Sequence, residues 1–195
     1  MTERPVRIAV IYYSSSGTVR HLAEGVADGA RQAGAEVRVR QVPGFDPDTE
    51  PLDASPPSNG DLAWADGIAL GTPARFGNVA AELKRFIDGT HPLWAEGGLT
   101  DKAVTGFTAA ASTHGGQEAT LLALYQSVYH WGGLIVSAGY VDPVQRAAGG
   151  NPYGASARSN RLGEVDTDTV GAARVLGGRL ASVAGRLRLV PVPIG

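Results

Sequence analysis

Three short segments of the 195-residue chain combine glycine with hydroxyl or amide side chains, and each precedes apolar residues at helical spacing. They are Ser14 to Thr18, Gly71 to Asn78 and Ala111 to Gln117. Hydroxyls, a glycine that lets the backbone approach a ligand, and the free N–H groups of a first helical turn suit a phosphate dianion. The chain has neither the glycine-lysine loop of nucleoside triphosphate sites nor the G-x-G-x-x-G of dinucleotide sites. The first segment also lacks lysine, which favours a monophosphate.

The second segment adds an aromatic ring, a cation and an amide, which together suit a planar heterocycle with acceptor atoms: Phe76, Arg75 and Asn78. A purely structural interpretation remains open for each segment. In that interpretation the serines and the threonine only cap a helix, Phe76 packs in a turn and Arg75 is solvated. If the segments follow neighbouring strands, they predict one shared ligand.

The elements that must position these segments alternate between strand and helix. Buried or half-buried apolar runs predict five strands, at Arg7–Tyr13, Glu36–Val42, Asp66–Gly71, Ala103–Ala110 and Leu134–Val136. Helical spacing predicts helices at Val19–Ala30, Asn78–Ile87, Gln117–Trp131 and Thr167–Leu187, the first one ended by Gly34. Residues 43–59, 72–77 and 142–166 are expected to be loops. The fold class is therefore α/β, a doubly wound parallel sheet in one domain (1–195), with ligands at the carboxyl ends of the strands.

Composition excludes several classes of protein. Seventeen Lys and Arg against 19 Asp and Glu give a net charge of -2, which argues against a nucleic-acid partner. Without cysteine the chain has no disulfides, thiolate catalysis or cysteine-bound metal, and its four scattered histidines predict no metal site. No apolar run approaches the roughly 18 residues of a membrane span, so a cytoplasmic protein without a membrane partner is expected.

Five motifs, in order and spacing, resemble the WrbA-type NAD(P)H:quinone oxidoreductases from Arg7 to about Leu187. They are Y-Y-S-S-S-G-T from Tyr12, G-T-P-A-R-F-G-N from Gly71, L-W-A around Trp94, G-G-Q-E from Gly115 and G-G-N-P-Y-G-A from Gly149. The resemblance implies a flavodoxin-like, three-layered fold whose five-stranded sheet has the order 2-1-3-4-5. It also implies non-covalent FMN, NAD(P)H as co-substrate, a quinone as acceptor and a homotetramer of 222 symmetry.

The same resemblance assigns roles to individual positions. It implies that the phosphate is held by Ser14, Ser15, Ser16, Gly17, Thr18 and Val19; that the flavin ring is bordered by Ala74, Arg75, Phe76, Gly77 and Asn78; and that its other rim is Ala111, Ser112, Thr113, His114, Gly115 and Gly116. Trp94 corresponds to a substrate-pocket tryptophan, and His130 to a histidine near the flavin that could relay a proton. Alternatively Trp94 fills the core and His130 is a partly buried structural histidine, while His21 is expected to be solvated.

Two positions depart from the family pattern. Ser16 stands where some relatives have an aromatic residue that meets the nicotinamide cofactor, and the loop that ends at Gly116 is one residue longer than in some members.

The expected function is two-electron reduction of quinones by a ping-pong mechanism in which NAD(P)H and quinone use one site in turn. Two alternatives remain: a one-electron carrier of the flavodoxin type, although such carriers are typically strongly acidic, and an FMN-containing interaction module without turnover. Leu93, Trp94 and Tyr153 lie outside the predicted sheet and helices, and such aromatics favour a subunit interface.

Overall fold

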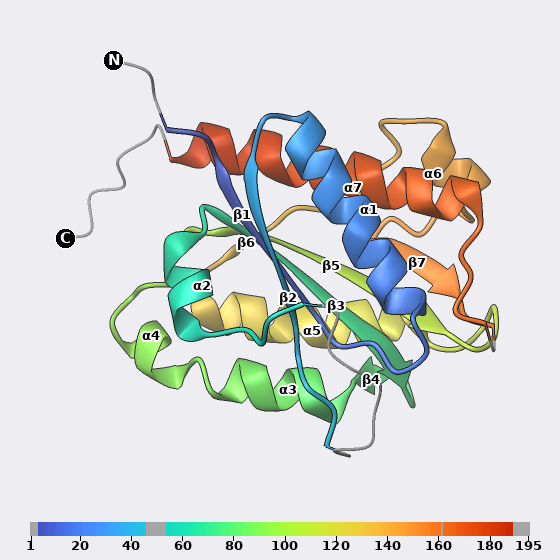
Figure 1. The fold of residues 1–195 in the computed structure, drawn as a ribbon, viewed down its shortest axis with the longest axis horizontal. Coiled ribbons are helices and arrows are strands. Elements are labelled where there is room, and N and C mark those ends of the chain that lie inside the picture. Colours follow the sequence, from blue (N-terminus) through green and yellow to red (C-terminus); the bar gives the residue numbers. More distant parts are fainter. Residues whose placement is uncertain (1–3, 46–53, 161, 189–195) are drawn as a thin grey trace.

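A twisted parallel sheet runs through the middle of the molecule (Figure 1), in the computed structural model that describes residues 4–45, 54–160 and 162–188. Its strands lie in the order β2-β1-β3-β5-β6. Their bounds are β1 Arg7–Tyr12, β2 Glu36–Gln41, β3 Gly67–Arg75, β5 Ala103–Ala110 and β6 Leu134–Ile135. Because β5 and β6 are the fourth and fifth strands expected from the sequence, the predicted order 2-1-3-4-5 is confirmed.

The burial of each strand follows its sequence pattern. Every residue of β5 is buried, as are all but the first of β1, because helices cover both faces of the sheet. β2 is the edge strand and alternates valine with arginine. Arg38 and Arg40 both pair with the buried carboxylate of Asp61, at 3.3 Å and 3.0 Å, so the positive charges on this edge are held in place.

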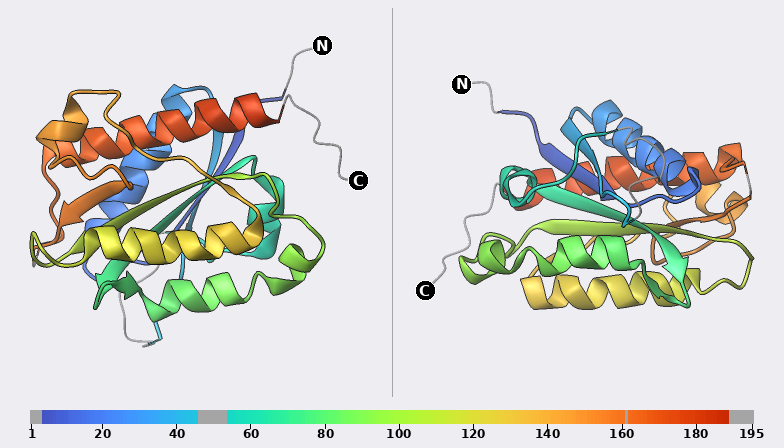
Figure 2. Two further views of the ribbon diagram at one scale, coloured as in Figure 1. Left: turned by 180° about the vertical axis from the view of Figure 1, so that it is seen from behind. Right: turned by 60° about the horizontal axis from the view of Figure 1, so that its bottom comes forward.

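Two helical layers sandwich the sheet (Figure 2). Helices α1 (Thr18–Gln32) and α7 (Thr167–Leu187) cover one face, and α3 (Ala81–Asp88) and α5 (Gln117–Trp131) cover the other. The sequence prediction gave the bounds of α5 and α7 correctly. The backbones of α1 and α7 touch, since a Cβ atom on Gly177 would lie 1.9 Å from the carbonyl oxygen of Val26.

The third strand is longer than predicted, and the expected helix after it starts later. β3 continues to Arg75, turns at Phe76 and Gly77, and pairs antiparallel with β4 (Asn78–Val79), so that α3 begins only at Ala81. Both turn residues have positive φ, 52° and 74°. Phenylalanine rarely adopts this conformation, so the sequence carried no recognisable signal for a two-residue turn.

Four further elements were missed because they are too short to show periodicity: α2 (Asn59–Trp64), α4 (His91–Ala95), α6 (Val144–Ala147) and β7 (Ala155–Arg158). The last two fall in the segment 142–166 that was predicted to be a loop, and α2 begins at the end of the predicted loop 43–59. Residues 46–53 of that loop lie outside the described ranges.

The fifth position of the sheet is divided between two strands. β6 pairs with the first two residues of β5, and β7 pairs with its last four. Between them, the hydroxyl of Tyr125 accepts a hydrogen bond from the Gly106 N–H (3.1 Å) and donates one to the Tyr153 carbonyl. Burial raises the pKa of Tyr125 to about 12, so this hydroxyl keeps its proton at neutral pH.

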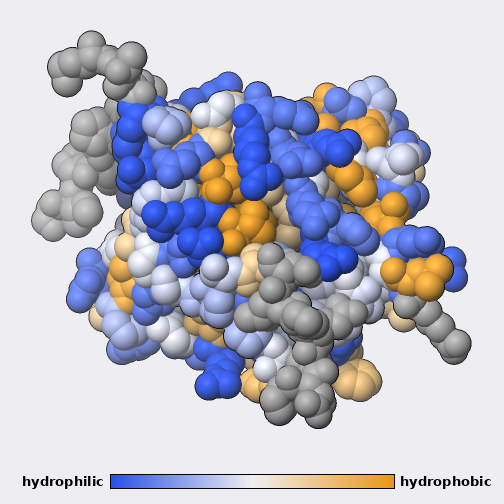
Figure 3. Space-filling view, in the orientation of Figure 1, coloured by the Kyte–Doolittle hydropathy of each residue, from blue (hydrophilic) through white to orange (hydrophobic). Residues whose placement is uncertain are grey.

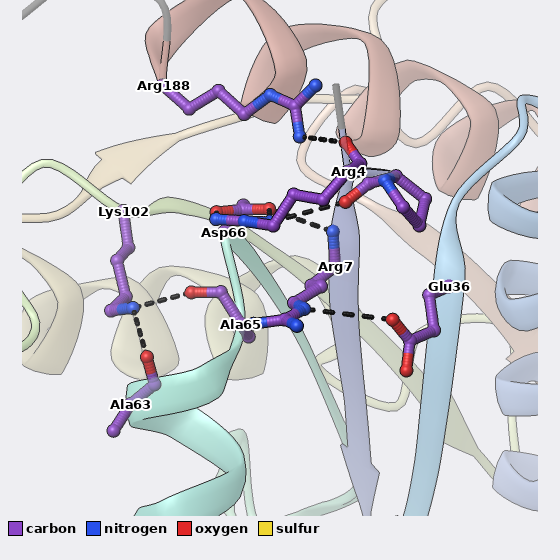
Figure 4. Close-up of polar contacts among 9 residues, drawn as sticks. Arg4, Arg7, Glu36, Ala63, Ala65, Asp66, Lys102 and Arg188 are labelled. Atoms are coloured by element: carbon purple, nitrogen blue, oxygen red, sulfur yellow. Dashed lines mark hydrogen bonds and ion pairs between the residues drawn. The ribbon is translucent and has the colours of Figure 1, made fainter. Parts of the chain in front are cut away.

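A cluster of polar contacts closes the sheet at its amino edge, opposite to the expected ligand edge (Figure 4). Asp66 accepts two hydrogen bonds from the Arg4 guanidinium, at 2.7 Å and 2.8 Å, and one from the Arg7 N–H at 2.9 Å. Lys102 donates to the carbonyls of Ala63 and Ala65 at the end of α2. Burial by itself would raise the pKa of Asp66, but the hydrogen bonds from Arg4 and Arg7 outweigh it and lower that pKa.

Replacing Asp66 with asparagine is expected to lower the free energy of unfolding at pH 7 by about 1 kcal/mol, a modest value because Arg4 is half exposed. The folded-state pKa lies below the unfolded value of about 3.9, so this stabilisation is present above that value and is lost as pH falls through the folded pKa. Urea unfolding of both proteins at pH 7 and at pH 2.5 tests this. A difference that is as large in acid as at pH 7 would contradict the assignment.

The outer surface of the face in Figure 3 is mostly hydrophilic, with small, separate hydrophobic patches. Within the described ranges, no helix has the length and apolarity needed to cross a membrane.

Candidate active site at the carboxyl edge of the sheet

A hollow of about 500 Å³ opens where β1, β3 and β5 end. We call it the cradle. Its lining residues are Ser15, Ser16, Thr18, Val19, Pro73, Ala74, Arg75, Ala109, Ala110, Ala111, Ser159 and Asn160. Seven of these belong to the predicted cofactor-binding set. Three lining residues were missed: Ala109 and Ala110 end a predicted strand, and Pro73 falls in the predicted loop 72–77, which the structure makes part of β3. Ser159 and Asn160 depend on β7, which was not predicted.

Helix α1 begins at the cradle without a side-chain cap. Its N-cap is Gly17, at φ 87°, and among the residues that the structure describes no side chain accepts a hydrogen bond from the N–H groups of the first turn. The Ser14 hydroxyl instead accepts from the Gly17 N–H at 3.1 Å, and the hydroxyls of Ser16 and Thr18 lie 3.5 Å apart. The interpretation that these residues only cap the helix is therefore wrong. The first turn also holds no acidic residue, so it offers uncapped N–H groups and hydroxyls to an anion.

Arg75 connects the first and second segments across the cradle. Its guanidinium donates a hydrogen bond of 3.0 Å to the Ser15 hydroxyl, which places one positive charge beside the start of α1. Next to the first segment, burial and then a hydrogen bond with Glu82 raise the pKa of Tyr13 to about 12, so this phenol stays neutral at pH 7.

The second and third segments meet at two glycines. A Cβ atom on Gly116 would lie 2.9 Å from the Cα atom of Gly77, so neither chain could approach so closely with a side chain at Gly116. The third segment is braced by Gln117, whose side chain accepts from the Gly115 N–H (3.0 Å) and donates to the Ser112 carbonyl (2.8 Å). The two predicted rims of the ligand site are thus adjacent.

Phe76 stands at the tip of the β3–β4 turn with its ring fully exposed, at 103%. The interpretation that it packs in the turn is wrong. An aromatic residue that is held at positive φ and makes no packing contact of its own costs folding energy, which is typical of residues that serve a ligand or a partner.

Trp94 and His130 do not reach the cradle of their own chain. The Trp94 indole N–H donates to the His130 carbonyl at 2.7 Å, and both residues line a hollow of about 330 Å³ between α4 and the end of α5. Because α5 starts beside the cradle and has 15 residues, this hollow lies about 22 Å away, at the amino edge. Trp94 is 44% exposed, so it does not fill the core.

Three further side chains lie elsewhere than the sequence suggested. His21 is half-buried and not fully solvated: its Nδ1 lies 2.8 Å from the Gly163 carbonyl oxygen, a contact that ties α1 to the segment that precedes α7. Thr113 and His114 line a separate hollow on the far side of the third segment. Among the described residues, no three histidine or carboxylate side chains gather as metal ligands do.

Comparison with known proteins identifies the chain's family. The model of the NADPH-dependent FMN reductase family matches residues 6–143. A protein of Geotalea uraniireducens named NAD(P)H dehydrogenase (quinone) is 38% identical over 201 residues, which cover 93% of this chain and 99% of that protein. One of the same name from Deinococcus radiodurans is 38% identical over 169 residues, which cover 80% and 84%. The chain belongs to the NAD(P)H dehydrogenase (quinone) family. A WrbA-like flavodoxin of Agrobacterium tumefaciens superimposes with a TM-score of 0.70 at 29% identity, covering 93% of this chain and 98% of that one.

The residues of the cradle fit the FMN that this flavodoxin-like family implies. The part of the cradle at the start of α1 offers hydroxyls, uncapped N–H groups and one arginine, as a phosphate monoester requires. The walls toward the rims are apolar, formed by Pro73 and the alanines 74 and 109–111, as a ring system requires. The volume lies within the range of sites for small ligands.

Proposed function

We propose that the chain is an FMN-dependent NAD(P)H dehydrogenase that reduces quinones. The observation that carries this proposal is the cradle, in which an uncapped helix start, four hydroxyl side chains and Arg75 adjoin apolar walls. The names of the relatives from Geotalea and Deinococcus support the reaction. The chemistry that FMN supplies when bound is the transfer of two electrons from NAD(P)H to the quinone.

The chain's own residues bind and orient. The hydroxyls of Ser15, Ser16 and Thr18 and the first N–H groups of α1 hold the phosphate, while Arg75 adds a charge-assisted hydrogen bond. The third segment presents backbone N–H groups at the opposite rim, and the bracing by Gln117 keeps its shape before the cofactor binds. Hydrogen-bond donors that are already in place stabilise negative charge on the bound FMN without reorganising, which favours reduction of the FMN.

The active form is proposed to be a homotetramer in which each site combines two chains. Trp94 and His130 are exposed at the amino edge, so they complete a cradle only if that cradle belongs to a neighbouring subunit. In that arrangement Trp94 borders the quinone, and the His130 imidazole passes a proton to the quinone oxygen. Exposed aromatics also favour an interface: Tyr129 is 71% and Tyr140 54% exposed. Use of NAD(P)H and the lack of cysteine favour the cytoplasm.

The purified protein is expected to bind FMN and to catalyse quinone reduction by NAD(P)H with parallel initial-velocity lines, because both substrates occupy the same site in turn. Steady-state kinetics at several fixed quinone concentrations measure this. Intersecting lines would contradict the ping-pong order. FMN binding without any NAD(P)H-dependent quinone reduction would instead favour the electron carrier or the interaction module.

A further inference from the structure

A second hollow of about 460 Å³ lies beside the cradle, on the other side of the strand ends. Its walls come from the third segment, the start of α5, the region of α6, β7 and the start of α7. The lining residues are Thr113, His114, Gln117, Glu118, Ala147, Ala148, Gly149, Asn151, Ser156, Ala157, Arg158, Asp166 and Thr169. We call it the outer hollow.

The outer hollow and the cradle are separated by very little chain. Arg158, the last residue of β7, lines the outer hollow, and the next residue, Ser159, lines the cradle. In the same way Ala111 lines the cradle, while Thr113 and His114 of the same segment line the outer hollow. A ligand that passes over the third segment or over the end of β7 can therefore contact the outer hollow and the cradle at the same time.

The side chains of the outer hollow divide into those already engaged and those available. Asp166 caps α7 by accepting from the N–H and the hydroxyl of Thr169, and Asn151 donates to the Ser156 hydroxyl. By contrast, the side chains of Arg158, His114 and Glu118 make no hydrogen bond or ion pair with any residue that the structure describes. The available groups are thus a guanidinium and an imidazole, which donate to phosphates, and a carboxylate, which accepts from ribose hydroxyls.

We propose that the outer hollow binds the adenosine-phosphate half of NAD(P)H, with Arg158 and His114 on its phosphates and Glu118 on a ribose hydroxyl. The inference rests on the proposed function, since it supplies a place for the half of the co-substrate that takes no part in the chemistry. A guanidinium that accommodates a nucleotide phosphate and a carboxylate that accepts from ribose are the groups that dinucleotide sites use. The volume of the hollow lies within the range of sites for small ligands, and its lining combines hydrogen-bonding side chains with small apolar ones.

The experiment measures binding of adenosine 2′,5′-bisphosphate, which has the adenosine-phosphate half and no nicotinamide. Titration calorimetry on the FMN-loaded protein is expected to show binding. Arg158→Gln is expected to weaken binding of the probe tenfold or more, with FMN affinity and the melting temperature unchanged. His114→Gln is expected to weaken binding of the probe severalfold. The control is Arg186→Gln, which removes the same charge at the other end of α7 and is expected to bind the probe as the wild type does.

Three outcomes would overturn the proposal: no binding of the probe to the wild type, wild-type affinity in Arg158→Gln, or an equal loss in Arg186→Gln. If His114→Gln weakened FMN and not the probe, His114 would belong to the cradle rim and not to the nucleotide site. Failure of the proposed function is separable, because probe binding without any reduction of quinone by NAD(P)H would leave the outer hollow assigned and the activity refuted.

Discussion

Co-expression of two nearly inactive variants in equal amounts is expected to recover about a quarter of wild-type quinone reductase activity. The first variant is Gly17→Val, and the second carries both Trp94→Ala and His130→Ala. The first variant disrupts the cradle, and the second removes the Trp94 and His130 side chains that a neighbouring subunit is proposed to contribute. Valine at Gly17 would have to adopt a φ of 87°, which a β-branched residue strongly resists, and its side chain would crowd the phosphate. The nearest atoms to a Cβ there are 3.9 Å away, so the fold itself is expected to survive.

The recovery is expected because the cradle of one chain lies far from the Trp94 and His130 of the same chain. If a cradle uses Trp94 and His130 of a neighbouring subunit, random assembly gives a site with both halves intact in about one case in four. Co-expression of the two variants with different affinity tags, purification through both tags and a quinone reductase assay measure the effect. If one chain supplied both halves, the mixed assembly would be no more active than the variants alone. The double-tagged wild type provides the reference activity.

Replacing Gly177 with alanine is expected to cost about 2–4 kcal/mol of stability, whereas the same change at the adjacent Gly178 is expected to be neutral or stabilising. A Cβ atom at Gly177 would overlap the Val26 carbonyl oxygen at 1.9 Å, so α1 and α7 would have to separate. At Gly178 the nearest atom is 3.4 Å away, and alanine favours the helix.

Thermal unfolding of the two alanine variants tests this packing directly. For a chain of this length, the loss at Gly177 corresponds to a fall in melting temperature of roughly 5–15 °C. Both variants replace glycine with alanine at neighbouring positions of one helix, so they have the same composition and gain the same helix propensity. A difference between their melting temperatures therefore reports the packing. Equal melting temperatures would show that the contact between α1 and α7 is not as close as the structure has it.

The sequence by itself determined which segments form the main strands and the long helices, and its resemblance to a known family implied the order of the strands. The continuous apolar runs of β1 and β5 and the helical spacing over α5 and α7 extend far enough for periodicity to be read, and packing against the sheet did not override it. It also determined which segments meet at the cradle, because hydroxyl and glycine residues follow three strands whose carboxyl ends must share one edge.

Only the tertiary structure decided how those segments act. Whether Ser14 to Thr18 cap α1 or leave it open depended on the φ of Gly17, and whether Phe76 is packed or exposed depended on the two-residue turn that continues β3 into β4. Ser159 and Asn160 joined the cradle only because β7 pairs with β5, a contact between segments about 50 residues apart. The family resemblance pointed to Trp94 and His130, but only the structure shows that they lie at the amino edge of the sheet, away from the cradle of their own chain. The length of α5 sets this separation, because a helix advances a fixed distance with each residue.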